Sequence, residues 1–441
     1  MSDIQKTPLK NHIDFLTGFP FKSEGYTDNL TDIKLLCGDN IAQGCLRWDT
    51  VKRWPRVDKE KYGRYLLKEG DVVLAMDRPW IDAGLKFASV APDDLPSLLL
   101  QRTARLRGSE TLDIYYLRYI IGSPWFTKYV KNINTGSLVP HISGDQIKNF
   151  SFPVPPINHQ RKVSAVLTAI DKKIELNNLI NVELEAMAKL IYDYWFVQFD
   201  FPDANGKPYK SSGGKMVYNK TLKREIPDGW EVGSLGDIEP NIVTGKTPST
   251  KKPENFKGNI PFICIGDVRC NMHITKTELT LSDLGADSQA NKYIPKGAIC
   301  VTCIASPGLV GFATENSQTN QQLNTVICSQ VENQYLLYFY LKDHFMFAKA
   351  KTGNTFANMN KGDFSSIKVI CPQKYILKRF TKHLQPTIDK ILVNSKESNK
   401  LIELRDWLLP MLMNGQVTVT DASPSDGIHE KTTPGLLRQL K

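Results

Sequence analysis

The sequence predicts an α+β protein with two strand-rich domains, separated by two long antiparallel helices that form a coiled-coil rod with approximate internal twofold symmetry. Three observations support this fold class. The chain has 441 residues, more than one hydrophobic core usually organises. Most of the sequence forms two similar copies of one repeat, and each copy ends in a long run with helical apolar spacing. A hydrophobic share of 41% and a charged share of 23% are typical of a folded protein.

The repeat covers a strand-rich module and the helix that follows it. Five segments of the first copy return in the same order in the second. They are LTGFP from residue 16 and VTGKTP from 243, YLLKEGDVVLAM from 65 and YIPKGAICVTC from 293, YYLRYIIGSPWF from 115 and QYLLYFYLKDHF from 334, NTGSLVPHISGDQIKNFSFPVP from 134 and KTGNTFANMNKGDFSSIKVICP from 351, and TAIDKKIELNN from 168 and PTIDKILVNSK from 386. A repeat of roughly 220 residues is far longer than the roughly 20–50 of a solenoid, so the unit of duplication is a whole domain with its helix.

The order of these segments divides the chain into five parts. We expect a first strand-rich domain over 1–155, a helix over 156–197, a connector with a second strand-rich domain over 198–373, a second helix over 374–415 and a poorly ordered tail over 416–441. Segments such as GDVVLAM and GAICVTC predict strands, because an apolar run follows a Gly turn. The connector DFPDANGKPYKSSGGKM is rich in Gly, Pro, Ser and Lys and predicts a mobile link.

The two helices are predicted from long runs with apolar residues three and four apart, which is the spacing of a coiled-coil seam. Residues 157–196 contain no Gly or Pro. Polar residues interrupt both seams at mid-length, at 175–178 and at 394–400. Each helix could pack on its own domain, but pairing with each other buries seams of this length better. Pro386 lies inside the second pattern and is expected to kink that helix or to mark its start.

The charge balance favours a polyanionic partner. The formal net charge is +10 and the isoelectric point is near 9.0, which favours nucleic acid. No run of about 18 apolar residues and no secretory signal pattern occurs, so we expect a cytoplasmic protein with no membrane partner. The eight cysteines are scattered, and the close pair Cys300 and Cys303 lies in a predicted strand, where residues three apart face opposite sides. We therefore expect reduced thiols and no metal site.

The sequence contains no recognisable catalytic motif. The segment TGKTPS has Pro240 where a phosphate-binding loop needs a Gly, five residues before Gly245. Dinucleotide, zinc-protease and nucleophile-elbow motifs are absent, as is the Asn-Pro-Pro-aromatic signature of an amino-methylating DNA methyltransferase. His141 aligns with Asn358 of the other copy and is therefore no shared catalytic base. These observations predict a binding protein rather than an enzyme.

Residues 153–201, PVPPINHQRKVSAVLTAIDKKIELNNLINVELEAMAKLIYDYWFVQFDF, closely resemble the central region of the specificity subunits of type I restriction-modification enzymes. The shared features are Pro-Pro with a Gln four residues on, Ile-Asp-Lys-Lys-Ile-Glu-Leu-Asn, and Tyr-Trp-Phe. IPDGWEVGSLGDI from residue 226 and LRDWLLPMLMNGQV from 404 resemble the opening of that family's second recognition domain and the close of its distal helix. The first copy differs, because LKNHIDFLTGFPF lacks the Asp-Gly-Trp opening.

The resemblance implies a function as well as a fold. The parts 1–155 and 198–373 would be target recognition domains, each binding one half of a split double-stranded DNA sequence, with the helices setting the spacer. The chain would be a non-catalytic subunit without a cofactor. It would direct two modification subunits, which bind S-adenosylmethionine and methylate adenine, and restriction subunits, which use ATP and Mg²⁺. The residues alone leave two alternatives open: a self-sufficient DNA methyltransferase or nuclease, and a duplicated DNA-binding regulator.

We expect the DNA contacts on loops, because strands and helices use their apolar residues for packing. Amides and hydroxyls can pair with base edges, whereas lysines mainly meet phosphate. The alternative for each residue is a solvated turn side chain or a buried, hydrogen-bonded amide. The candidates are Thr17, Lys22, Arg78, Arg102, Thr135, Ser137 and His141 in the first copy, and Lys246, Thr247, Ser249, Lys251, Arg269, Gln321, Gln322, Asn324, Thr352, Asn354 and Asn358 in the second.

Overall fold

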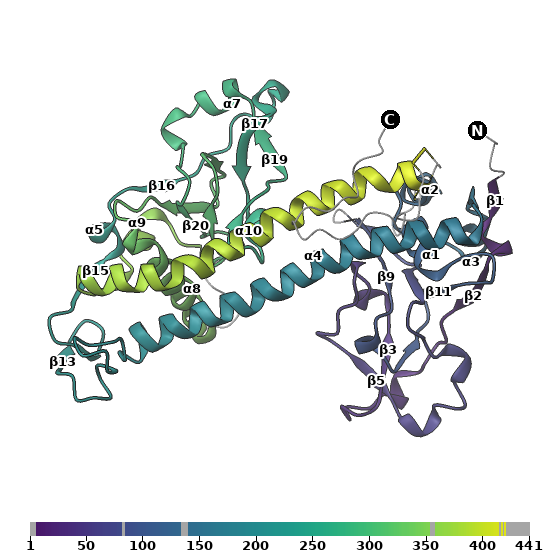
Figure 1. Ribbon diagram of the computed structural model, residues 1–441, viewed down its shortest axis with the longest axis horizontal. Helices are drawn as coiled ribbons and strands as arrows, with labels where there is room; N and C mark the ends of the chain where they lie inside the picture. Colours follow the sequence, from purple (N-terminus) through teal and green to yellow (C-terminus); the bar gives the residue numbers. More distant parts are fainter. Residues whose placement is uncertain are drawn as a thin grey trace, which may run out of the picture. The chain divides into compact units, whose positions relative to one another are not determined.

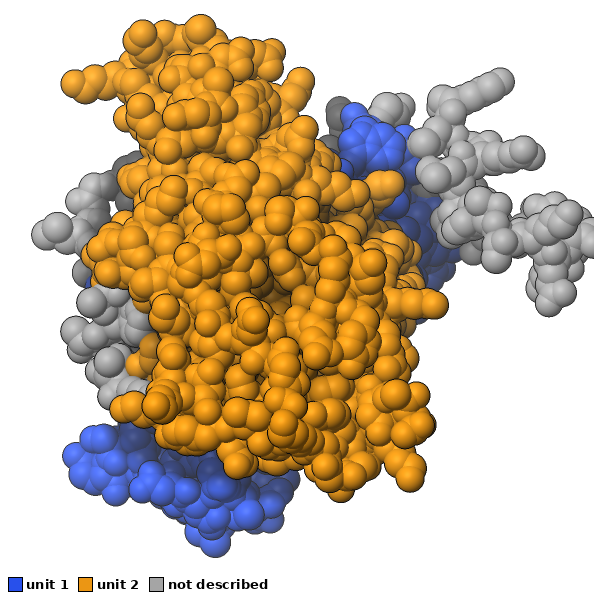
Figure 2. All heavy atoms as spheres, turned by 90° about the vertical axis from the view of Figure 1, so that its left-hand side faces the viewer, with its two compact units in different colours: residues 1–171, 403–441 blue, residues 172–402 orange. Residues whose placement is uncertain are grey.

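The computed structural model describes residues 6–81, 84–133, 140–352, 358–413, 416–417 and 419. These residues form two compact units (Figure 2). Unit 1 comprises residues 1–171 and 403–441, and unit 2 comprises residues 172–402. Each unit holds one strand-rich module and a stretch of each of the two long helices, α4 (Ile157–Tyr192) and α10 (Lys374–Met413) (Figure 1). Most of the expected tail lies outside the described residues.

Unit 1 is built on a five-stranded sheet and a three-stranded sheet. The five-stranded order is β2 (Ile13–Thr17), β11 (Thr103–Gly108), β6 (Val72–Ala75), β9 (Phe87–Ser89) and β4 (Gln43–Gly44). The three-stranded order is β10 (Ser97–Leu99), β3 (Ile33–Leu36) and β5 (Lys52–Trp54). Unit 1 also contains the pairs β1 (Lys6–Pro8) with β12 (Ser151–Pro153) and β7 (Trp80–Ile81) with β8 (Gly84–Leu85), the helices α1 (Ile114–Ile121), α2 (Pro124–Ile133) and α3 (Gly144–Asn149), and short 3-10 helices.

Unit 2 repeats this topology. Its five-stranded order is β16 (Ile242–Thr244), β23 (Leu323–Val326), β20 (Ile299–Thr302), β21 (Val310–Ala313) and β18 (His273–Ile274). Its three-stranded order is β22 (Gln318–Thr319), β17 (Phe256–Ile263) and β19 (Leu279–Leu281). Unit 2 also contains the pairs β15 (Glu231–Ser234) with β24 (Lys368–Cys371) and β13 (Met216–Asn219) with β14 (Arg224–Pro227). Its helices are α5 (Leu235–Ile238), α6 (Ile265–Val268), α7 (Asp283–Asp287), α8 (Glu332–Thr352) and α9 (Lys361–Ser365), with a π-helical turn at Asp193–Val197 and short 3-10 helices at Pro253–Asn255 and Ala290–Lys292.

The strand directions agree pair by pair between the units. The four pairings of each five-stranded sheet are antiparallel except for the last, β4 with β9 and β18 with β21, which is parallel. In both three-stranded sheets one pairing is parallel and the other antiparallel. The duplication predicted from the sequence is therefore confirmed as two copies of one fold.

The central strand of each sheet is buried on both faces, which explains its continuous apolar sequence. In β6, Val72 and Leu74 pack with helix α1, while Val73 and Ala75 pack with β3 and β10. The side chains of the equivalent strand β20 also alternate between two hydrophobic clusters. Cys300 and Cys303 accordingly belong to different hydrophobic clusters, as their spacing predicted. Burial raises the pKa of the Cys300 thiol to about 12, so at neutral pH it packs as an uncharged side chain.

The long helices run antiparallel within each unit. In unit 2, Asn177 Nδ2 donates to Glu397 Oε2 at 2.8 Å, and Asn394 Nδ2 donates to Asn181 Oδ1 at 2.9 Å. Asn177 and Asn394 are each 1% exposed. The two polar interruptions of the seams therefore meet in one hydrogen-bonded layer, in which Asn177 and Asn394 are the buried members. The possible helix start at Pro386 is wrong, because α10 begins at Lys374 and continues through Pro386.

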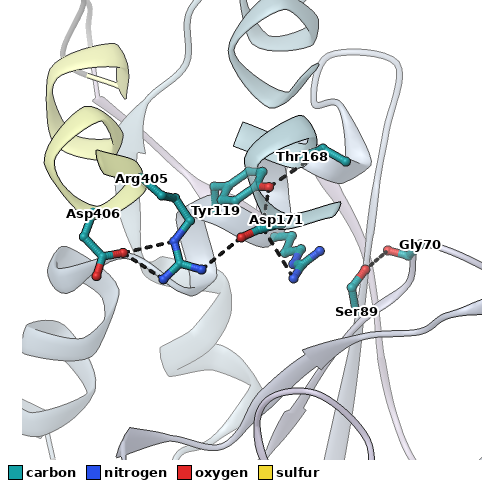
Figure 3. A network of polar contacts seen from close by, with 8 residues as sticks. Gly70, Ser89, Tyr119, Thr168, Asp171, Arg405 and Asp406 are labelled. Atoms are coloured by element: carbon teal, nitrogen blue, oxygen red, sulfur yellow. Dashed lines mark hydrogen bonds and ion pairs between the residues drawn. The ribbon is translucent and has the colours of Figure 1, made fainter. Parts of the chain in front are cut away.

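In unit 1 the two helices meet at a charged contact (Figure 3). The Asp171 carboxylate of α4 accepts from Arg405 Nη1 of α10 at 2.9 Å and from the Tyr119 hydroxyl of α1 at 2.7 Å. Arg118 Nη2 lies 3.6 Å from the same carboxylate. Asp171 is the Asp of the repeated segment TAIDKKIELNN, so the repeat contains a residue that fastens both helices to the first module.

Candidate nucleic-acid interface

Four predicted residues of unit 1 come together at one end of the five-stranded sheet. Backbone hydrogen bonds join the turns that carry them. Gly18 N donates to Thr103 O at 3.0 Å, Met76 N donates to Arg102 O at 2.9 Å, and Ile142 N donates to Met76 O at 2.9 Å. These bonds gather what we call the first turn cluster, which consists of Thr17, Asp77, Arg78, Arg102 and His141.

The same bonds recur in unit 2. Gly245 N donates to Leu323 O at 3.1 Å, Cys303 N to Gln322 O at 2.8 Å, and Met359 N to Cys303 O at 2.9 Å. They gather the second turn cluster, which consists of Thr244, Lys246, Thr247, Gln321, Gln322 and Asn358. Because the bonds match one for one, they align Arg102 with Gln322 and His141 with Asn358.

Each cluster begins with a Thr-Gly pair, and the Gly is required because the backbone of a neighbouring turn approaches it closely. A Cβ atom at Gly18 would lie 1.9 Å from the Leu100 carbonyl oxygen, and one at Gly245 would lie 2.1 Å from the Asn320 carbonyl oxygen. Only Gly lets the two turns approach this closely. The glycines are thus structural, and they place Thr17 and Lys246 beside the neighbouring turn.

Charged side chains dominate the first cluster. The Asp77 carboxylate lies 3.0 Å from Arg102 Nη1 and 2.6 Å from His141 Nδ1. Both partners are more than half exposed, at 73% for Arg102 and 53% for His141. Arg78 and Arg102 adopt φ angles of 46° and 64°, which non-Gly residues rarely do outside functional sites and tight turns.

Uncharged amides dominate the second cluster. Thr247 Oγ1 donates to Gln321 Oε1 at 2.5 Å, and Asn320 Nδ2 donates to Gln322 Oε1 at 3.0 Å. Asn358 accepts from Ala305 N at 3.3 Å. The side chains of Lys246, Gln321 and Asn358 are exposed. This turn surface presents amide donors and acceptors and one ammonium group.

Sequence reasoning missed three residues that shape the clusters. Asp77 lies two residues after the end of the buried strand β6, but nothing in the sequence paired it with Arg102. Beneath the second cluster, Gln289 Nε2 donates to the Lys246 carbonyl oxygen and to Gln318 Oε1, each at 2.7 Å. Gln289 and Gln318 are 5% and 0% exposed, so they support the turn from the interior. No local sequence pattern distinguishes such buried amides from exposed ones.

One predicted contact residue is unsuited to that role. Asn324 is 3% exposed, and its side-chain oxygen accepts from Thr244 Oγ1 at 2.7 Å. It therefore joins β23 to β16 and is not presented to a ligand. The amide belongs to the strand, because β23 spans Leu323–Val326.

Other predicted residues lie outside the two clusters. Lys22, Ser249, Lys251 and Arg269 are exposed on loops, and no hydrogen bond or ion pair joins them to a cluster in the described structure. Ser249 and Lys251 follow Thr247 on the same loop, between β16 and residue 253. Thr135, Ser137 and Asn354 lie outside the described residues. Thr352 ends α8, and its side chain also falls outside the described part.

Comparisons with known proteins define the class of this fold and surface. The family described as "Type I restriction modification DNA specificity domain" matches residues 3–186 and 227–403, one match in each copy. The chain belongs to this family. It is 33% identical to the HindI type I restriction enzyme specificity subunit of Haemophilus influenzae, over 66% of this chain and 74% of that one. The identity to the MjaIX specificity subunit of Methanocaldococcus jannaschii is 28%, over 69% of each chain.

A solved structure shares the fold. The type I restriction-modification S subunit of M. genitalium matches 93% of this chain and 97% of its own, with a TM-score of 0.53 and 14% sequence identity. Family membership makes the chain a non-catalytic, DNA-recognising specificity subunit with two specificity domains, an arrangement consistent with a bipartite target. The two alternatives, a self-sufficient methyltransferase or nuclease and a lone regulator, gain no support. Among the described residues, no helix is both long and apolar enough to span a membrane.

Proposed function

We propose that each unit binds one half of a split DNA target and that its turn cluster contacts the bases. The observation that carries this proposal is the convergence of predicted residues. Turns near residues 17, 78, 102 and 141 meet at one sheet end in unit 1, and their counterparts meet at the equivalent end in unit 2. A surface assembled from loops on a rigid sheet is where binding residues are usually found.

The two clusters differ in chemistry, which suits two different half-sites. Arginine pairs best with the O6 and N7 atoms of guanine, and Gln or Asn pairs best with the N6 and N7 atoms of adenine. The first cluster offers Arg78 and Arg102, and the second offers Gln321, Gln322 and Asn358. The exposed lysines, Lys22, Lys246 and Lys251, would meet phosphates and orient the duplex.

We assign the long helices the role of setting the distance between the half-sites. Equivalent major-groove faces of DNA recur about every 34 Å, so a reader of two half-sites needs a spacer of fixed length. The hydrogen-bonded layer of Asn177, Asn181 and Asn394, in which Asn177 and Asn394 are buried, supports this role, because buried polar pairs fix the register of paired helices. A slip by one turn would separate these amides from their partners.

Two modification subunits are the proposed partners of the helices. Helix α4 carries exposed apolar side chains along its unit 2 portion, namely Leu176, Leu179, Val182, Met187 and Leu190, each 51–66% exposed. Large exposed apolar patches usually mark sites of association. These partners would bring S-adenosylmethionine for adenine methylation, and restriction subunits would add ATP- and Mg²⁺-dependent cleavage. DNA as the substrate implies action in the cytoplasm.

The proposal is tested by methylome sequencing of cells that express the chain with its modification subunits. We expect methylated adenines in a bipartite motif with a fixed spacer. The variant Gln321→Ala should relax one base of one half-site, with a loss of about 1–3 kcal/mol in discrimination. Asn354→Ala should act on the same half-site. Equal relaxation of both halves, or a continuous motif, would contradict the assignment of one unit to each half.

A further inference from the structure

The carboxylate of Asp77 forms an interaction that stability does not explain. It accepts from Arg102 Nη1 at 3.0 Å and from His141 Nδ1 at 2.6 Å, at a surface where both partners are largely exposed. Exposed ion pairs contribute little to folding, typically below about 1 kcal/mol. The left-handed conformation of Arg102 costs a similar amount or more. The arrangement therefore points to a role in orienting Arg102.

An arginine held on one side keeps its other donors for a ligand. The guanidinium group has five N–H donors in a fixed plane. Asp77 engages Nη1, and the remaining donors lie on a side chain that is 73% exposed. Two parallel N–H groups of arginine match the O6 and N7 acceptors of guanine in the major groove. Orientation by a neighbouring carboxylate lowers the entropy that Arg102 must lose when it binds.

Unit 2 provides an internal comparison. The backbone bonds that align the clusters place Ile304 where unit 1 has Asp77, and Gln322 where unit 1 has Arg102. Ile304 has no group that could orient a polar partner. The charged pair thus distinguishes the first copy from the second at otherwise matched turns.

We propose that Asp77 is a positioning residue that directs Arg102 onto a guanine in the half-site bound by unit 1. This inference rests on the proposed function, because it assumes that the first turn cluster contacts bases. It adds the identity of one base and the role of a carboxylate that itself touches no DNA.

The first test compares methylomes of the complex with wild-type chain, Arg102→Ala and Asp77→Asn. The half-site of unit 1 is the one that Gln321→Ala leaves unchanged. We expect it to contain a guanine, at which Arg102→Ala abolishes discrimination and Asp77→Asn weakens it, while the other half-site stays intact. Glu69→Gln is the matched control, since Glu69 is an exposed acid in the turn at the opposite end of β6. It should leave both half-sites unchanged.

The second test measures binding of the purified complexes to duplexes with 7-deazaguanine at that position. Removing N7 should weaken wild-type binding about 5-fold or more. Arg102→Ala should be insensitive to the replacement, and Asp77→Asn should show a reduced effect. A merely structural Asp77 would lower affinity equally for guanine and 7-deazaguanine.

Two results would overturn the inference while leaving the proposed function standing. One is a unit 1 half-site without guanine, and the other is full 7-deazaguanine sensitivity in Asp77→Asn. Failure of the proposed function has a different signature, namely a wild-type complex without a bipartite methylation motif, and that result would overturn both.

Discussion

Asp171 provides a direct test of how the repeated segment supports the fold. The variant Asp171→Ala removes an acceptor that serves Arg405 at 2.9 Å and the Tyr119 hydroxyl at 2.7 Å, with Arg118 at 3.6 Å. The Asp171 side chain is only 13% exposed. We therefore expect a clear loss in the free energy of unfolding.

The size of that loss follows from the contacts. Each hydrogen bond to a charged group contributes about 1.5–3 kcal/mol, and breaking a buried ion pair costs about 3–5 kcal/mol. Arg405 is 30% exposed, so water can partly replace the lost carboxylate. We expect Asp171→Ala to lower the unfolding free energy by about 3 kcal/mol.

The second copy supplies the matched control. Asp389 is the Asp of PTIDKILVNSK, but it is exposed, and its carboxylate accepts from Gln385 Nε2 at 2.8 Å within the same helix. Asp389→Ala should cost less than about 1 kcal/mol. Urea unfolding of the full chain, with Arg405→Ala to complete a double-mutant cycle, measures both effects. Equal losses for Asp171→Ala and Asp389→Ala, or no coupling between Asp171 and Arg405, would refute the reasoning.

Three further predictions concern pH, spacing and assembly. Burial lowers the pKa of His273 to about 4, with the nearby Asp389 opposing and Lys396 adding to the effect. The folded pKa of His273 lies below the unfolded value of about 6.5, so about 3 kcal/mol of stability is present above pH 6.5 and is lost as pH falls toward 4. Urea unfolding at pH 7.5 and 4.5 measures this loss, and the variant His273→Leu should not show it. Inserting four residues near 175–178 adds about 6 Å of helix and should lengthen the DNA spacer by one or two base pairs in the methylome, whereas inserting two residues should rotate the seam and abolish assembly. An unchanged spacer with full methylation would contradict the proposal that the helices set the spacer. Leu190→Lys should weaken binding of modification subunits in size-exclusion chromatography, while Leu30→Lys, at an 80% exposed position of unit 1, should not.

The sequence was sufficient for the architecture because the determining signals are local and repeated. A Gly turn followed by an apolar run predicted the buried strands β6 and β20, and apolar spacing predicted α4 and α10. The sheet order could not be predicted, since pairing such as β11 between β2 and β6 depends on contacts distant in sequence. The start of α10 was ambiguous because Pro386 breaks a helix by propensity, whereas packing keeps the helix continuous through it.

The candidate site also contains some residues that the sequence predicts and others that it does not. Thr17 and His141 were predicted from turn chemistry, because a hydroxyl and an imidazole group stand next to Gly18 and Pro140. Arg102 was proposed from LLLQRTA, a segment that contains no Gly or Pro. Sequence patterns could not separate exposed Gln321 from buried Asn324, since both belong to one polar run and strand geometry alone turns Asn324 inward. Asp77 was missed for a different reason. Its significance lies in partners 25 and 64 residues away, which only the folded chain brings within hydrogen-bond distance.

The way the clusters are held explains how one fold can serve two different half-sites. The bonds that bring the turns together, from Met76 to Arg102 and from Cys303 to Gln322, run between backbone atoms. Gly18 and Gly245 occupy equivalent positions in the two copies, where a neighbouring carbonyl oxygen leaves no room for a Cβ atom. Side chains at the matched positions take no part in these backbone bonds, and they differ fully: Asp77, Arg102 and His141 in one copy correspond to Ile304, Gln322 and Asn358 in the other. The backbone bonds that bring the turns together do not depend on which side chains occupy these positions. Exchanging all three residues of one cluster for those of the other should therefore alter one half-site and lower the free energy of unfolding by at most about 1–3 kcal/mol, because Asp77, Ile304 and Gln322 are only partly exposed.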